Sequence, residues 1–172
     1  MKLNNTLINL CLFIGCVGVV LTFRLIPHPP NFTPVIALSF YLPIIFGLWS
    51  LPFCILGFAI TDYFIGFHSL LIWTWGGLLL VGLISKLSKN LTDRLTLAFL
   101  SSLIFFTVSN FGVWLTGSFY EHSIQGLITC YIMAIPFFTN SLLSTMIFAI
   151  FIEFFVFSKY FNFMPMIKKK HN

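Results

Sequence analysis

The sequence predicts an all-α membrane protein, a six-helix transmembrane bundle with a re-entrant or capping segment before the last helix. Of its 172 residues, 59% are hydrophobic and only 8% are charged, and the mean hydropathy is +1.02. Soluble domains carry roughly a quarter charged residues. The uncharged stretches here are long enough for helices of about 20 residues that cross a bilayer. They cover residues 3–23, 25–61, 63–85, 95–120 and 122–152. We therefore expect residues 1–172 to form a single integral membrane domain.

The first half of the chain predicts three helices separated by prolines. The first covers about Leu7–Phe23 and ends at Arg24, because the prolines that follow remove helical hydrogen bonds. The next uncharged stretch is too long for one straight helix, and Trp49-Ser50-Leu51-Pro52 predicts a break within it. We expect two short helices here, over about Pro34–Trp49 and Leu51–Gly66.

The second half of the chain predicts three more helices. The fourth covers about Leu70–Ser85 and is followed by a basic loop that includes Arg94, the fifth covers about Leu95–Gly117, and the sixth about Phe137–Ser158. The segment Phe119–Pro136 is too irregular for a span and too apolar for a solvated loop. Irregular backbone at membrane depth must be covered by protein, so we expect this segment to be re-entrant or to cap the bundle.

The basic residues predict the orientation of the bundle. Six spans place both termini on one side, which receives eight of the nine basic residues, and cytoplasmic loops carry an excess of Lys and Arg. These residues are Lys2, Lys86, Lys89, Arg94, Lys159, Lys168, Lys169 and Lys170. We expect a multi-pass protein of the bacterial inner membrane, with N- and C-termini in the cytoplasm. The outer side then collects Arg24, His28, Asp62, His68, Glu121 and His122.

Several classes of partner and activity are not expected. The four cysteines, Cys11, Cys16, Cys54 and Cys130, lack metal-type C-x-x-C spacing and are interpreted as packing residues. The basic run Lys168-Lys169-Lys170 directly follows a span and is typical of a membrane anchor rather than a nucleic-acid site. No nucleophile motif, metal motif or phosphate loop is present, so we expect no enzyme and no cofactor. The lipid bilayer is the expected partner.

The connection after the first helix is stiff and carries polar side chains. Four prolines in Arg24–Pro34 fix their own backbone angles and restrain the residues before them. The connection thereby holds Arg24, His28 and Asn31, which offer an ion-pairing fork, a titratable ring and an amide to a polar ligand. The alternative is a proline-rich connector with an Arg and a His at the membrane interface.

Asp62 is predicted inside the third helix. It lies about four residues, or ~6 Å, from the outer end of that helix, at a depth where an unpaired charge costs several kcal/mol. We expect a partner among Arg24, His28 and His68. Asp62 then either contributes to a ligand site or pairs with Arg24 only to join two helices.

The fifth and sixth predicted helices also carry polar residues. Thr107, Asn110 and Trp114 recur at intervals of three and four, which places them on one stripe. In that arrangement Asn110 would bind the edge of a ligand while Trp114 stacks on it. Asn140 begins a similar face on the sixth helix, where small hydroxyl residues such as Ser141 more often join helices.

Glu153 lies apart from these groups, near the predicted cytoplasmic end of the sixth helix. It is on a different side of that helix from Asn140. We expect Glu153 to pair with Arg94 or Lys159, the alternative being a docking contact with a partner protein.

Several motifs together resemble an uncharacterised family of small bacterial membrane proteins. These motifs are His28-Pro29-Pro30-Asn31-Phe32-Thr33-Pro34, Thr61-Asp62 with Gly66-Phe67-His68, Ser109-Asn110-Phe111-Gly112-Val113-Trp114, and Cys130-Tyr131 with Ala134-Ile135-Pro136-Phe137-Phe138-Thr139-Asn140. The resemblance covers about residues 20–150. The overall shape is similar to the substrate-binding (S) components of energy-coupling-factor vitamin transporters.

The second resemblance implies a function and a partner. Such components bind a vitamin or a metal ion at their outer end, and an ATPase-driven module releases it inside. The resemblance places the ligand between the first outer loop and the fourth to sixth helices. This chain departs from the family's A-x-x-x-A docking spacing, because its first helix offers only Gly15 and Gly18.

The sequence therefore predicts a membrane-embedded binding and transport protein for a small vitamin-like or polar solute. The alternative is a non-transporting scaffold or accessory subunit in which the polar groups only join helices. A metal ion is less favoured, because the spacing of the candidate ligands is long and irregular. The candidate solute-binding residues are Arg24, His28, Asn31, Asp62, His68, Asn110, Trp114, His122 and Asn140.

Overall fold

The computed structural model describes residues 5–66 and 69–157, and within these ranges the chain is all-helical. The α helices are α1 (Asn5–Leu25), α2 (Val35–Phe46), α3 (Ser50–Ile65), α4 (Leu71–Ile84), α5 (Leu91–Thr116), α6 (Ile124–Met133) and α7 (Ile135–Ile152). A 3-10 turn, Ser85–Leu87, extends α4, and a π-helical turn, Glu153–Phe157, extends α7. The all-α class is confirmed, with seven α helices in the described ranges rather than six.

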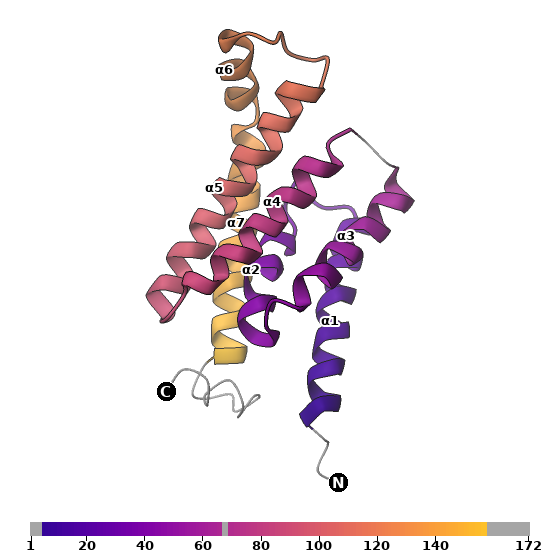
Figure 1. The fold of residues 1–172 in the computed structure, drawn as a ribbon, viewed down its shortest axis with the longest axis vertical. Coiled ribbons are helices and arrows are strands. Elements are labelled where there is room, and N and C mark those ends of the chain that lie inside the picture. Colours follow the sequence, from indigo (N-terminus) through magenta and orange to yellow (C-terminus); the bar gives the residue numbers. More distant parts are fainter. Residues whose placement is uncertain (1–4, 67–68, 158–172) are drawn as a thin grey trace.

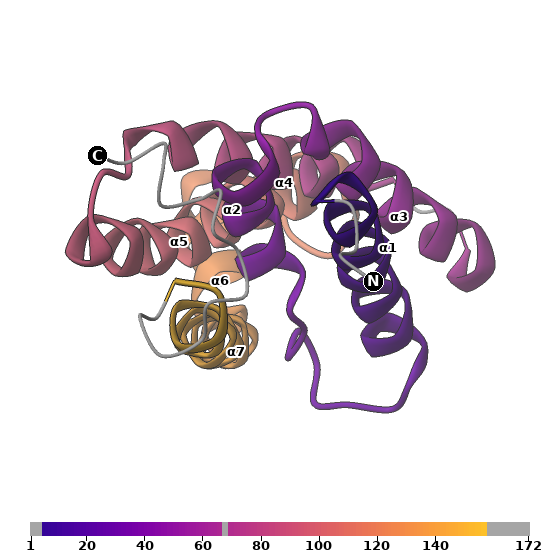
Figure 2. The ribbon, with the colours of Figure 1, turned by 90° about the horizontal axis from the view of Figure 1, so that it is seen from below.

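The helices are arranged around α2. Figure 1 shows α1 beginning and α7 ending at one end of the molecule, whereas α6 lies at the other end, which we call the α6 end. Residues 35–43 of α2 are all buried, and α2 contacts α1, α3, α4, α5 and α7 (Figure 2). Its sequence is apolar on nearly every face, which is the pattern of a helix enclosed on all sides.

Local signals move two helix boundaries away from their expected positions. The helix α2 ends at Phe46 instead of Trp49, because Gly47 adopts a φ of 97°, which ends a helix easily when no Cβ is present. The helix α5 begins at Leu91, because the side chain of Asn90 accepts a hydrogen bond from the amide of Asp93 at 2.9 Å. Arg94 therefore belongs to the first turn of α5 and not to a loop.

The segment expected to be irregular contains the helix α6. The hydroxyl of Ser123 caps it by accepting a hydrogen bond from the amide of Gly126 at 3.1 Å. A Cβ at position 126 would overlap the carbonyl oxygen of Glu121, so this turn requires glycine. The phenol of Tyr131 donates to the carbonyl of Thr107 at 2.7 Å and joins α6 to α5. The segment thus folds as a short helix that extends the α6 end beyond the other helices (Figure 1).

A largely buried charge cluster joins three elements at the end opposite α6. Arg94 forms a two-pronged pair with Glu153, from Nε to Oε1 at 2.6 Å and from Nη2 to Oε2 at 2.8 Å. The hydroxyl of Tyr41 donates to the same Oε1 at 2.8 Å. The cluster therefore joins α2, α5 and the end of α7. The expected pairing of Glu153 with Arg94 is confirmed, and the other candidate, Lys159, lies outside the described residues.

Two of the described helices are long and apolar enough to cross a membrane. They are α5, with 26 residues, and α7 with its π turn, with 23 residues. The other apolar helices in the described ranges are shorter.

A tight contact between α4 and α5, at Gly112 and Trp73, leads to a first prediction. A Cβ at Gly112 would overlap the Cβ and Cγ of Trp73, atoms at the root of a large side chain that cannot move away independently of α4. Gly112→Ala should therefore destabilise the protein by about 1–3 kcal/mol through overpacking. Gly76→Ala is the matched control, because a Cβ there meets no atom within 4 Å. Thermal unfolding of both variants checks this, and equal midpoints would show that the α4–α5 contact is not tight.

Candidate ligand-binding cavity

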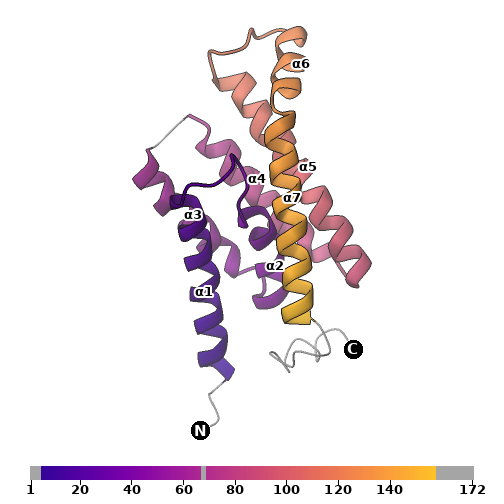
Figure 3. The ribbon, with the colours of Figure 1, turned by 180° about the vertical axis from the view of Figure 1, so that it is seen from behind.

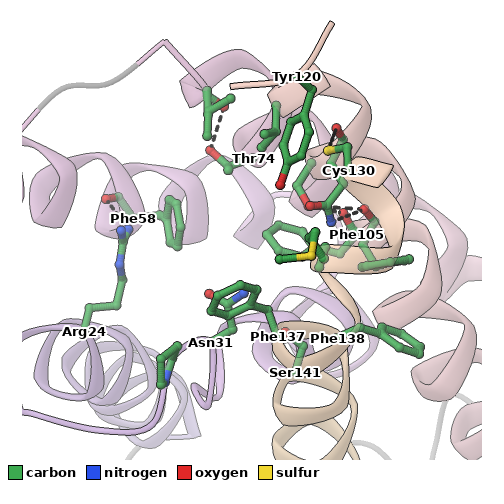
Figure 4. A pocket seen from close by; sticks show the side chains of 18 residues that line it. Arg24, Asn31, Phe58, Thr74, Phe105, Tyr120, Cys130, Phe137, Phe138 and Ser141 are labelled. Carbon is green, nitrogen blue, oxygen red and sulfur yellow. Dashed lines mark hydrogen bonds between the residues drawn. The ribbon is translucent and has the colours of Figure 1, made fainter. Parts of the chain in front are cut away.

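A cavity of about 470 Å³ opens among the helices toward the α6 end (Figure 4). Its walls come from the end of α1, from the connection between α1 and α2, from α3 to α6, and from the first turns of α7. Six of the 18 residues that line it are aromatic. The aromatic residues are Phe58, Phe105, Phe106, Tyr120, Phe137 and Phe138. The volume lies within the range of about 300–1,000 Å³ that is usual for small-molecule sites, which are mostly apolar with a few fixed polar groups.

A second cavity of about 200 Å³ adjoins the first. The two share a boundary formed by Arg24, Asn31, Phe58, Phe105 and Ser141. The rest of the smaller cavity is lined by the α1–α2 connection and the first turn of α2, through His28, Thr33, Val35 and Ile36. The pair of cavities therefore has an aromatic chamber and a smaller, more polar recess, with Arg24 between them.

The guanidinium of Arg24 is held in place by α3. Its Nη2 donates to Oδ1 of Asp62 at 2.6 Å, and its Nη1 donates to the carbonyl of Phe58 at 3.2 Å. Its Cζ lies 3.5 Å from the centroid of the Phe58 ring, and Figure 4 shows the side chain reaching from α1 toward Phe58. Of the five N–H groups of a guanidinium, these two bonds use two. The remaining donors belong to a side chain that lines both cavities.

Asp62 lies behind Arg24 and is 1% exposed. While Oδ1 binds Arg24, Oδ2 accepts a hydrogen bond from Nε1 of Trp75 at 2.8 Å. The carboxylate thereby joins α1, α3 and α4, and Asp62 is not among the described residues that line either cavity. The expectation that Arg24 is a partner of Asp62 is confirmed. The indole of Trp75 thus reaches inward to this carboxylate, a contact that the sequence did not predict.

The connection between α1 and α2 is fixed across the cavities. Asn31 has a φ of 62°, a left-handed conformation that asparagine tolerates better than most residues. The side chain of Asn140 donates to the carbonyl of Pro30 at 3.0 Å, which fastens the connection to α7. Figure 3 shows the ribbon of α7 and of the α1–α2 connection from this side. Nε2 of His28 is buried and has no hydrogen-bond partner among the described residues. The stiffness expected from the prolines is thus reinforced by a long-range contact.

Of the other predicted site residues, some line the larger cavity and others do not. Asn110 lines the larger cavity, although its Nδ2 is already bonded to the carbonyl of Phe106 at 2.8 Å. Trp114 and His122 lie apart from it: Nε1 of Trp114 donates to the carbonyl of Glu121 at 2.9 Å, and the Trp114 and His122 rings are 5.8 Å apart. These two residues hold the connection between α5 and α6. His68 lies outside the described residues.

The aromatic wall of the cavity was missed by sequence reasoning. Phenylalanine occurs 23 times in the chain, so an individual Phe gives no signal that separates a cavity wall from a lipid-facing surface. Ser141 was interpreted as a helix-joining residue, yet it lines both cavities. Among the residues that the structure describes, no group of three or more His, Cys, Asp or Glu side chains is placed to hold a metal ion.

The fold and the cavity define a small helical protein with an aromatic chamber and a fixed guanidinium at one end. The chain belongs to a family of unknown function, DUF6580, whose model matches residues 2–164. The expected membership of an uncharacterised family is therefore confirmed. No curated protein and no solved structure matches the chain.

Proposed function

We propose that this chain is a membrane-embedded binding protein that takes up a small solute from the extracytoplasmic side. The observation that carries the proposal is the cavity of about 470 Å³ in which a fixed guanidinium meets an aromatic wall. Such a combination of apolar walls and a few oriented polar groups is characteristic of small-molecule sites. The cavity is lined in part by the α1–α2 connection, α4, α5 and α7, and this lining supports the ligand position that the resemblance to S components implies.

The exposed surface supports a multi-pass membrane protein. In the most apolar windows of the two long helices, only 22% and 28% of the residues are buried. Shorter helices also expose large apolar side chains, including Ile14 of α1, Phe64 of α3 and Ile72 of α4. Exposed apolar surface of this extent is rare in soluble monomers. In the proposed arrangement α1 to α5 and α7 form the six-helix bundle, and α6 caps the cavity.

The basic residues support a cytoplasmic position for both termini. Lys86 and Lys89 lie between α4 and α5, at the end opposite α6 (Figure 1). The positive-inside rule then places that end in the cytoplasm and the cavity on the outer side.

A transporting module is the proposed protein partner. Uptake against a gradient needs an energy source, and in S components an ATPase-driven module supplies it. Gly15 and Gly18 lie on a face of α1 where an added Cβ would meet no atom within 4 Å. Small residues at a helix surface allow another membrane helix to approach closely, which supports α1 as the docking helix despite the unusual spacing.

A non-transporting scaffold is the second candidate. It is favoured by one observation: both oxygens of Asp62 are used inside the protein, by Arg24 and Trp75. On that reading the polar groups serve only to join helices.

A variant with a filled cavity separates the two candidates. Ser109 lines the larger cavity, and its hydroxyl bonds only to carbonyls of its own helix, so Ser109→Trp should occupy the cavity at little cost to the fold. Leu103→Trp, on an exposed position of the same helix, is the matched control. After incubation with bacterial cell extract, native mass spectrometry should find a small molecule on the wild type and on Leu103→Trp but not on Ser109→Trp. The proposal fails if the wild type retains nothing that Ser109→Trp lacks.

A further inference from the structure

We infer that the solute is an amphipathic acid with a single negative charge, whose acidic group lies in the smaller cavity against Arg24 and whose apolar body lies in the larger one. This inference rests on the proposed function and specifies the chemical class of the solute.

The first argument is the state of Arg24. Its guanidinium is fixed by Asp62, by the carbonyl of Phe58 and by the Phe58 ring, so little side-chain freedom remains to be lost when a ligand binds. Two N–H groups are used, and the side chain lines both cavities. The planar fork of arginine matches the two oxygens of a carboxylate better than any neutral group. The remaining donors thus belong to a side chain that borders a space that an acidic group fits.

The second argument is the set of groups around the smaller cavity. His28 lines it, and the buried Nε2 of His28 lacks a partner in the described structure. The first turn of α2 contributes Val35 and Ile36 to the wall, and Pro34 provides no side-chain cap for the amides of that turn. First-turn amides are hydrogen-bond donors at the positive end of a helix. No acidic side chain is among the described residues of this wall, so no carboxylate of the wall would repel an acidic group.

The third argument sets the charge and the shape. Asp62 already neutralises Arg24 at 2.6 Å, so a bound acid is held by hydrogen bonds and not by a net positive charge. A doubly charged phosphate would therefore cost more desolvation free energy in this low-dielectric site than an acid with one negative charge. The smaller cavity, of about 200 Å³, suits a head group, whereas Phe105, Phe106 and Phe137 surround the larger cavity. Aromatic walls favour an apolar or aromatic body.

The identity of the retained molecule tests this inference separately from the proposed function. In the native mass spectrometry experiment, a retained carboxylic acid that is absent from Ser109→Trp supports it. A retained neutral or cationic molecule overturns the inference but leaves the binding function intact. If nothing is retained, the binding function itself fails.

Matched probes and one pair of variants test the role of Arg24. We would measure the thermal unfolding of the purified protein with a panel of aryl and alkyl carboxylates, each beside its own primary amide. The acids should raise the unfolding midpoint more than the amides. In the double variant Arg24→Gln/Asp62→Asn, which keeps a neutral hydrogen-bonding pair, this preference should disappear, with a loss in acid affinity of about tenfold or more.

Two results would overturn the inference. One is that acids and amides raise the unfolding midpoint of the wild type equally, or that neither raises it. The other is an unchanged acid preference in the double variant. Because that variant alters both residues of an ion pair, His28→Gln provides a second test. This variant should lower the affinity for acids severalfold and leave the affinity for amides unchanged. A merely structural role for His28 would not produce that selectivity.

Discussion

Replacing Glu153 by alanine should cost the protein about 3–5 kcal/mol of folding free energy, the usual effect of removing one partner from a buried ion pair. The side chains of Arg94 and Glu153 are only 11% and 10% exposed. Without Glu153, the guanidinium of Arg94 and the fully buried Tyr41 lose the acceptor that both use. Chemical denaturation of the protein in detergent micelles measures the loss.

A double variant separates a stranded charge from a lost contact. In Arg94→Met/Glu153→Leu both charges are gone and the volumes are roughly kept, so only Tyr41 lacks an acceptor. This variant should be more stable than Glu153→Ala alone, because apolar replacement of a whole buried pair is often neutral. If the double variant is the less stable of the two, the cluster contributes through its net attraction and this explanation is wrong.

The second large effect is expected at Asp62. Asp62→Ala leaves Arg24 and the indole of Trp75 without their acceptor, and with Asp62 1% exposed we again expect a loss of about 3–5 kcal/mol. The variant also releases Arg24 from its fixed position, so solute retention should fall even at temperatures where the protein remains folded. Unfolding curves and native mass spectrometry on the same sample give both readings.

The apolar replacement of this pair distinguishes binding from helix joining. Arg24→Met/Asp62→Leu should fold with near wild-type stability but retain no acidic solute, because the guanidinium is gone. If the pair serves only to join helices, the double variant should change the stability of the fold and should not change solute binding by the folded protein. Full retention of the acid by this folded variant would exclude Arg24 as the binding group.

The helices were largely predictable from the sequence because their signals are local. Prolines after Arg24 and the break near Pro52 divide the first three helices close to the observed boundaries. The helix α6 was missed because its segment was judged by apolarity and irregularity. The capping residue Ser123 and Gly126 are both present in the sequence. Neither signal predicts a helix strongly in so apolar a segment, and their roles are clear only from the folded turn.

The candidate site was predictable in part of its polar lining: Arg24, Asn31 and Asn110 line the larger cavity, and His28 lines the smaller one. An isolated acid in an apolar helix needs a partner, and that requirement predicted one for Asp62 among Arg24, His28 and His68, of which the structure shows Arg24. The role of Trp75 depends on the rotation of α4 relative to α3, which residue spacing within one helix cannot give. The same is true of Trp114 and His122, which share an end of the molecule with the cavity but point toward the α5–α6 connection.

The central claim, that this cavity binds a solute, is tested most directly by equilibrium titration of the retained molecule into three purified proteins. Isothermal calorimetry should give similar dissociation constants for the wild type and Leu103→Trp. For Ser109→Trp, affinity should fall by about tenfold or more, equivalent to about 1.4 kcal/mol or more, because the indole occupies the space that the solute needs. Equal affinity in all three proteins would contradict the claim and place the binding site elsewhere.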